Sequence, residues 1–198
     1  MTTHDSIQLY HGARRWVDPP QVRPHKKNRA DWGPGLYLTT CAVTARKYGS
    51  LRSFHLCPTT RWSIDALVPY DTVLRWLLKV RYEYHIPSKV ALVQHYLGER
   101  RRYTGGELDI PGESLVSFME PLYTGKIGVA LAEFFVENDI DGHYTQHGEI
   151  TVLFNMKKIL RNEPVSPRAL SAPSFVWDLP TIPAQRVRAL NGAKEQKK

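Results

Sequence analysis

The sequence lacks the features that would place the chain in a membrane, outside the cell or around a metal ion. Two cysteines, Cys41 and Cys57, among 198 residues are too few for a disulfide scaffold, and no paired Cys/His spacing of the zinc type occurs. No segment approaches the roughly 18 uninterrupted apolar residues that a membrane span needs. The first residues, 1–5, lack the charged-then-apolar order of a secretory signal. We therefore expect a cytoplasmic protein with reduced thiols, no bound metal and no contact with a membrane.

Acidic residues are outnumbered. The 27 lysines and arginines exceed the 19 aspartates and glutamates and give a formal charge of +8. Such a surface attracts phosphates, an acidic protein or anionic lipid, and nucleic acid is the commonest of these partners. The cations occur in runs at 14–15, 26–29, 100–102 and 194–198. Runs of this kind are equally typical of solvated faces that only aid solubility.

The pattern of apolar residues predicts an α+β fold in one globular domain. Hydrophobic residues make up 42% of the chain, enough for a sizeable core. Periodicity of two predicts strands, and periodicity near 3.6 predicts helices. The expected strands lie at 7–10, 36–39, 53–57, 61–65 and 149–154, and the expected helices lie at 42–48, around 73–80, around 90–97 and at 127–137. We expect a long loop at 18–35, a catalytic domain over 1–161 with a helical insert at about 66–120, and a proline-rich wrapping tail with a basic end over 162–198.

Three short fragments carry the residues best suited to chemistry. They are Leu-Tyr-His-Gly at 9–12, Gly-Pro-Gly-Leu-Tyr-Leu-Thr at 33–39, and Gly-Glu-Ile-Thr-Val at 148–152. The first presents an imidazole, His11. The second presents an aromatic ring, Tyr37, and the third presents a carboxylate, Glu149, after all the expected helices. Each is unremarkable alone, since a tyrosine on a strand or a glutamate at a strand start is usually core or surface. Their order suggests one site.

This ordered set resembles the catalytic domain of the ADP-ribosyltransferases of the His-Tyr-Glu type, the poly(ADP-ribose) polymerase and diphtheria toxin superfamily. The resemblance spans positions 9 to 154, but the helical block has no clear counterpart in it. It implies a split mixed or antiparallel sheet with flanking helices and NAD as substrate. The arginine-modifying branch of the transferases instead has an Arg-Ser-Glu pattern, with a Gln or Glu two residues before the catalytic Glu. In this sequence position 147 is His and there is no Ser-Thr-Ser run, so the chain resembles the His-Tyr-Glu branch more closely.

The resemblance also implies roles for the residues. Glu149 would hold the nicotinamide ribose and stabilise its cationic transition state, as carboxylates do in glycoside cleavage. His11 would bind the adenosine-side ribose, and the Gly12 backbone would pair with the nicotinamide amide. Tyr37 and Tyr48 would sandwich the nicotinamide ring. Thr39 would be a further cofactor-binding residue.

The resemblance leaves the acceptor open. The small size favours a single transfer, hence mono-ADP-ribosylation, and small basic members are often toxins or defence effectors, some with an antitoxin or inhibitor partner. Nucleic acid is slightly favoured over protein as acceptor, because the basic segments at 23–29 and 100–102 could follow a phosphate backbone. Two other functions remain: a non-catalytic RNA-binding module on the same fold, and a hydrolase that uses His11, His143 or His147 with Glu149.

Overall fold

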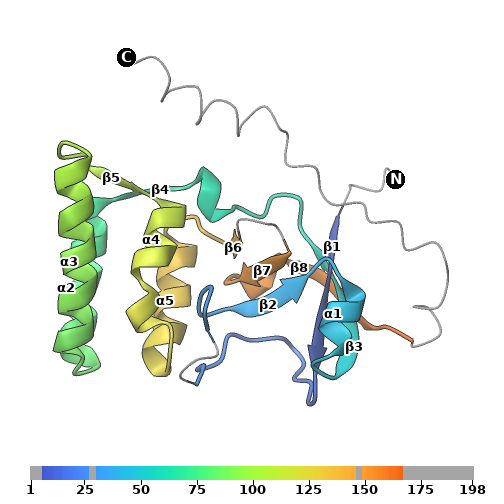
Figure 1. Ribbon diagram of the computed structural model, residues 1–198. Coiled ribbons are helices and arrows are strands. Elements are labelled where there is room, and N and C mark those ends of the chain that lie inside the picture. The colour runs from blue at the N-terminus through green and yellow to red at the C-terminus, as the bar shows by residue number, and fades with distance from the viewer. Residues whose placement is uncertain (1–5, 27–29, 146–148, 167–198) are drawn as a thin grey trace, which may run out of the picture. The chain divides into compact units, whose positions relative to one another are not determined.

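The fold is α+β and is built on a six-stranded antiparallel sheet, as the sequence predicts. The computed structural model describes residues 6–26, 30–145 and 149–166 (Figure 1). The strands are β1 (Ile7–Ala13), β2 (Leu36–Thr39), β3 (Ser50–Leu56), β6 (Gly142–Tyr144), β7 (Ile150–Leu153) and β8 (Ile159–Pro164). Their order across the sheet is β6-β7-β2-β1-β3-β8. Strands from the two ends of the described chain are therefore interleaved in one sheet.

Five helices accompany the sheet in the described part of the chain. They are α1 (Ala42–Arg46), α2 (Tyr70–Glu83), α3 (Pro87–Tyr103), α4 (Gly112–Phe118) and α5 (Lys126–Glu137), with short 3-10 turns η1 (Ser63–Asp65), η2 (Glu120–Leu122) and η3 (Met156–Lys158). A second, two-stranded sheet pairs β4 (Leu67–Pro69) with β5 (Asp109–Pro111). Figure 1 shows α2 and α3 together as the helical layer farthest from the six-stranded sheet, with α4 and α5 between them and that sheet.

The helical periodicity seen in the sequence faces the core. Val73, Leu77 and Val80 of α2 are buried, and α3 buries its own apolar stripe against them. Pro87 occupies the first turn of α3, where its missing N–H leaves no intrahelical bond unmade. The helix continues through Gly98 and ends before Gly105 and Gly106, which both have positive φ. Within the stretch expected as a helical insert, α2 and α3 form a packed helical hairpin, and β4, β5 and α4 lie in the same stretch.

Two apolar clusters lie on opposite faces of the sheet. The first joins α2 to α5 with β7, and the rings of Phe135 and Phe154 lie 4.8 Å apart in it. The second lies behind β1, β2 and β3 and contains Leu9, Leu38 and Phe54. Successive residues of a strand point to opposite faces, so β2 contributes Tyr37 to the first cluster and Leu38 to the second.

The structure corrects one expected strand and adds elements that the sequence pattern did not reveal. Residues 61–65 do not form a strand: Trp62 makes an isolated bridge to Gly142, and the chain then closes into η1. Helix α4 has no counterpart among the expected helices. Strand β8 runs to Pro164, slightly beyond the expected boundary at 161, while the expected tail from 167 onward lies outside the described residues.

Within the described ranges, no helix has the length and apolar character that crossing a bilayer requires.

Candidate active site

The three fragments singled out in the sequence meet on neighbouring strands. His11 lies on β1, Tyr37 lies on β2, and Glu149 directly precedes β7. Strand β2 runs between the other two, antiparallel to both. At the one level where β1 and β2 pair, through Tyr10, Thr39 and Ile150, two interstrand steps of about 4.8 Å place the backbones of β1 and β7 roughly 10 Å apart. That span suits two groups that contact different parts of one extended ligand.

The sheet is weakly joined between β1 and β2. Strand β1 pairs with β3 along its whole length, and β2 pairs with β7 along its whole length, but β1 and β2 share the single pair Tyr10 and Thr39. Beyond that pair, a side chain bridges the strands: Nδ1 of His11 lies 2.5 Å from the carbonyl oxygen of Tyr37. The imidazole thus stands at the point where the sheet divides.

The bond to Tyr37 fixes the tautomer of His11. A carbonyl only accepts hydrogen bonds, so Nδ1 must carry the proton, and in a neutral ring Nε2 is left as an acceptor. Burial lowers the pKa of His11, and the bond to the Tyr37 carbonyl opposes that shift. In a neutral imidazole with the proton on Nδ1, the Nε2 lone pair is suited to accept a hydrogen bond from a ligand hydroxyl.

Tyr37 is held by its hydroxyl. The backbone N–H of Trp32 donates to this oxygen, and the oxygen donates to the carbonyl of Gly33, both at 3.0 Å. Burial raises the pKa of Tyr37 to about 12, with the nearby charge of Asp31 acting in the same direction and the two backbone bonds opposing it. The phenol is therefore neutral near pH 7 and acts as an anchor for the turn before β2. Its ring, not its hydroxyl, is the part suited to contact a ligand.

Gly12 and Tyr48 are brought together by α1. A Cβ on Gly12 would lie 1.8 Å from the carbonyl oxygen of Ala45 and 3.4 Å from the nitrogen of Gly49. Close packing of α1 on β1 is thus a sufficient reason for glycine at this position. Tyr48 lies in the turn after α1 and is 69% exposed. Among the described residues it stacks on no other ring, so its largely exposed ring is accessible to a planar ligand.

Thr39 and Glu149 differ in how far their polar groups are already engaged. Thr39 is buried, and its hydroxyl accepts the backbone N–H of Cys41 at the turn into α1. Glu149 is exposed beside Ile150, which pairs with Thr39. By strand alternation, His11 and Glu149 belong to one face of the sheet, and Tyr37 belongs to the other. A ligand touching His11, Tyr37 and Glu149 must therefore reach across the division between β1 and β2.

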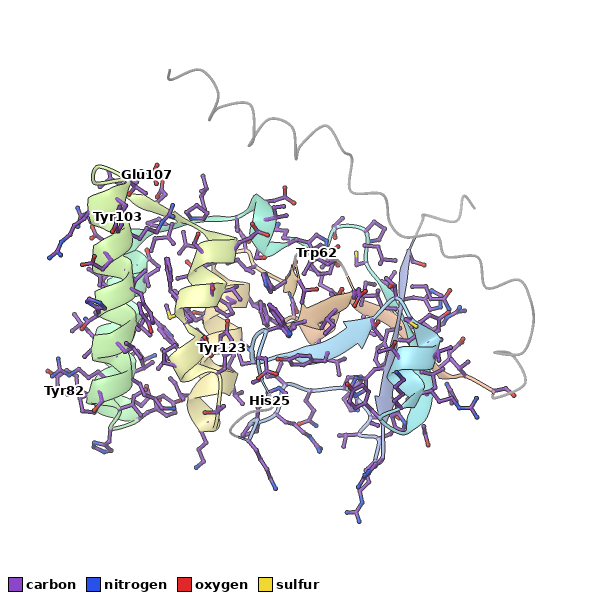
Figure 2. The ribbon with its side chains drawn as sticks, viewed as in Figure 1. His25, Trp62, Tyr82, Tyr103, Glu107 and Tyr123 are labelled. Carbon is purple, nitrogen blue, oxygen red and sulfur yellow. The ribbon has the colours of Figure 1, made fainter. Side chains whose placement is uncertain are left out.

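The structure adds three residues that the sequence motifs did not indicate. Trp16 and Arg52 lie against His11 on its own face of the sheet. His25 lies against Tyr37 with the rings 5.8 Å apart, and its Nε2 donates to the carbonyl of Gly35. Figure 2 shows His25 near Tyr123, where the loop meets the start of α5. No periodic or spacing signal marks these residues, because their contacts cross strands that are distant in sequence.

Two surface cavities lie away from these residues. One, of about 470 Å³, is lined by Arg61, Trp62, Asp65 and Asp139, and the other, of about 340 Å³, lies between Pro19 and β8. Neither includes His11, Tyr37 or Glu149. The larger cavity is open to solvent, and its Arg61 is already paired with Asp139.

His143 is unsuited to acid and base work in this structure. Its Nδ1 lies 2.7 Å from the hydroxyl of Ser63, which is 1% exposed. Burial lowers the pKa of His143 to about 4. The pair fastens β6 to η1, so the Nδ1 of His143 is already engaged. His147, its expected companion, lies outside the described residues.

Comparisons of the chain with protein-family models, with curated proteins and with solved structures found no significant match. The assignment of a function therefore depends on the geometry of the strand junction and on the motif resemblance.

Proposed function

We propose that this chain is an NAD-dependent mono-ADP-ribosyltransferase. The observation that carries the proposal is the hydrogen bond from His11 to the Tyr37 carbonyl, at the division between β1 and β2, with Glu149 entering the next strand. The residue types that the resemblance requires therefore lie on or directly before the adjacent strands β1, β2 and β7, although they are far apart in sequence. Tyr48, whose side chain is exposed, directly precedes Gly49, and the backbone of Gly49 lies beside Gly12.

The reaction needs a carboxylate more than it needs an acid or a base. Transfer breaks the bond between the ribose C1′ and the nicotinamide nitrogen, and the bonding electrons leave with nicotinamide as a neutral molecule. A lone pair of the acceptor then bonds to C1′, and the acceptor proton passes to solvent. Positive charge develops on the ribose meanwhile. In the proposal, the Glu149 carboxylate lies beside that ribose and stabilises the charge.

The other residues bind and orient. His11 accepts a hydrogen bond at Nε2 from a hydroxyl of the adenosine-side ribose, since Nδ1 is engaged with Tyr37. The rings of Tyr37 and Tyr48 hold the nicotinamide, a contact in which each aromatic pair contributes about 0.5–1.5 kcal/mol beyond buried area. This division of work requires no proton transfer by Tyr37, in keeping with its raised pKa.

Nicotinamide release from NAD tests the proposal. Glu149→Gln keeps the shape of the side chain and removes its charge, so we expect a loss of roughly 100- to 1,000-fold in turnover with an unchanged melting temperature. Glu163→Gln is the matched control, because Glu163 is also half-exposed on the same sheet but lies on β8. Unchanged turnover in Glu149→Gln removes Glu149 from the site. No nicotinamide release by the native chain favours a binding module, and turnover abolished by a chelator favours a metal hydrolase.

We further propose nucleic acid as the acceptor, on the distribution of charge. Described residues 6–56 contain seven cations (Arg14, Arg15, Arg23, Lys26, Arg46, Lys47 and Arg52) and two acids, Asp18 and Asp31. The described residues from 57 onward hold more acidic than basic side chains. The positive charge therefore gathers on the elements that carry His11 and Tyr48, where a polyanion would have to approach.

The basic run at 100–102 is less suited to this contact. Arg100 lies 3.3 Å from Glu107, Arg102 lies 2.8 Å from Glu99, and Arg101 stacks over Tyr70. Labelled NAD incubated with a cell lysate, followed by separate nuclease and protease digestion, identifies the acceptor class. Label that survives nuclease digestion and is lost on protease digestion would show that the acceptor is protein and not nucleic acid.

The biological setting in this proposal is that of a toxin or defence effector acting in a cytoplasm, either that of its own cell or that of a target cell. An inhibitory antitoxin is the partner such an activity calls for. Separate expression of native and Glu149→Gln chains in a bacterial host tests this setting, since the native chain alone should arrest growth.

A further inference from the structure

Three side chains, His11, Trp16 and Arg52, form a connected stack at the candidate active site. The ring of Trp16 lies 5.4 Å from that of His11 at an interplanar angle of 78°. The guanidinium of Arg52 lies over Trp16, 4.9 Å from its ring centroid. Arg52 and His11 are directly opposite each other on β3 and β1, so all three groups share one face of the sheet.

The stack is anchored at its far end. Arg52 donates to Asp18 at 2.9 Å and also bonds to Asn162 on β8, and its side chain is 18% exposed. These two oxygens fix the plane of the guanidinium, which in turn covers the indole. The order of contact is therefore Asp18 and Asn162, then Arg52, then Trp16, then His11.

The indole is not the side chain that stability alone would favour at position 16. Within the described residues, Nε1 of Trp16 is the buried side-chain polar atom that has no hydrogen-bond partner. A buried donor without a partner destabilises the fold, and a purely apolar side chain would avoid that penalty. The indole packs on Phe54, with the ring centroids 6.0 Å apart, and also contacts the imidazole of His11, which in turn lies perpendicular to Phe54 at 6.4 Å.

We propose that Trp16 and Arg52 are positioning residues that hold His11 in the tautomer and ring orientation required for binding NAD. Rotation of an imidazole by half a turn exchanges Nδ1 with a carbon, which would break the bond to Tyr37 and turn Nε2 away from a ligand. Trp16 blocks that rotation, and Arg52 keeps Trp16 in place. The identity of the ligand, NAD, rests on the proposed function, whereas the contacts of Arg52, Trp16 and His11 do not depend on it.

Two measurements on the full chain test it. Long-range proton–nitrogen NMR of ¹⁵N-labelled protein distinguishes the two neutral tautomers of a histidine, and His11 is assigned with a His11→Asn variant. Nicotinamide release gives KM and kcat. Native protein should show a single Nδ1–H tautomer at pH 7.5. Trp16→Leu should show a mixture, with KM for NAD raised about 3- to 10-fold, the value of one ordinary hydrogen bond, and kcat within about twofold.

If the Trp16→Leu chain does not fold, the matched variants Arg52→Lys and Arg161→Lys provide the test instead. Arg52→Lys keeps the charge beside Asp18 but loses the flat cation over Trp16, so it should shift the His11 tautomer and KM in the same direction. Arg161 lies on the adjacent strand, exposed and beside Glu163, and its variant should change neither. An unchanged His11 tautomer in folded Trp16→Leu or Arg52→Lys overturns the proposal. If neither the native chain nor any variant consumes NAD, the proposed function is wrong. The NMR measurement of the His11 tautomer then still tests whether Trp16 and Arg52 position His11.

Discussion

At the scale of single residues, two half-buried histidines illustrate how environment separates a candidate ligand-binding group from a structural one. His11 donates to a backbone carbonyl and keeps Nε2 available, whereas His143 is committed to Ser63. Burial lowers the pKa of both. The difference between them therefore lies in their partners and not in their protonation state.

His143 makes the fold sensitive to acid. Its pKa is 6.5 in an unfolded chain and about 4 in the folded protein, so the unfolded state binds more protons between these values. Its contribution to stability is thus fully present above pH 6.5 and is lost as the pH falls toward 4. We expect His143→Gln to flatten this part of the pH profile, measured as the free energy of unfolding in urea from pH 4 to 7.5.

The exposed His95→Gln is the control for that profile and should retain its native shape. A His143→Gln profile that still parallels the native one across this range would show that His143 is accessible to protons in the folded state. The same variant should retain nicotinamide release, because His143 has no part in the proposed reaction.

Sequence alone could identify His11, Tyr37 and Glu149 as candidates, because each belongs to a short motif with a local signature. It could not identify Trp16 or Arg52. Their relation to His11 is set by the register of β1 on β3, which pairs positions 11 and 52, and by a loop that folds Trp16 back over both. Strand register depends on the whole sheet, and no local pattern encodes it.

At the scale of elements, the turn before β2 determines how closely that strand approaches β7. A Cβ on Gly35 would lie 2.4 Å from the carbonyl oxygen of Leu153, a backbone atom that cannot move aside. We expect Gly35→Ala to destabilise the fold by about 1–3 kcal/mol, as overpacking does, and to weaken nicotinamide release. Urea denaturation and the turnover assay measure the two effects.

Gly98→Ala is the control, and we expect it to raise the stability of the fold where Gly35→Ala lowers it. Gly98 lies inside α3, and apart from its chain neighbours and the backbone of its own helix, no described atom lies within 4 Å of the place that a Cβ would take there. Alanine is the better helix former by about 0.8–1 kcal/mol, so that variant should be more stable than the native chain and equally active. A Gly35→Ala chain as stable as the native one would mean that β2 and β7 leave room for a methyl group between them.

Elements with strong local periodicity were predicted well. The β2 strand at 36–39 and the helices α2, α3 and α5 are confirmed, because their apolar spacing reflects the face they bury. The strand expected at 61–65 was wrong. Its alternating residues are instead positioned by distant partners, since Ser63 bonds to His143 and Trp62 stacks on Tyr144 at 4.0 Å. Tertiary contacts override a weak local pattern in such short segments.

At the scale of the whole molecule, the charge is divided along the chain. The helical hairpin of α2 and α3 presents exposed rings, including Tyr82 and Tyr103, on the side away from the sheet (Figure 2), but its Arg100 and Arg102 are paired with acids. The elements around the division between β1 and β2 carry the excess of positive charge. A polyanionic acceptor should therefore bind near His11, and not along the hairpin.

Salt dependence tests this division directly. Each phosphate contact with a single strand changes the slope of log affinity against log salt by about 0.7. Changing Arg14 and Arg15 together to Gln should therefore weaken binding of a single-stranded RNA oligonucleotide and reduce the slope by about 1.4, as measured by fluorescence anisotropy. Arg75 and Lys79, exposed on α2, form the matched double variant and should leave the slope unchanged. Equal effects of the two doubles would mean that the RNA senses only net charge, and a larger effect of the α2 pair would move the binding surface to the hairpin.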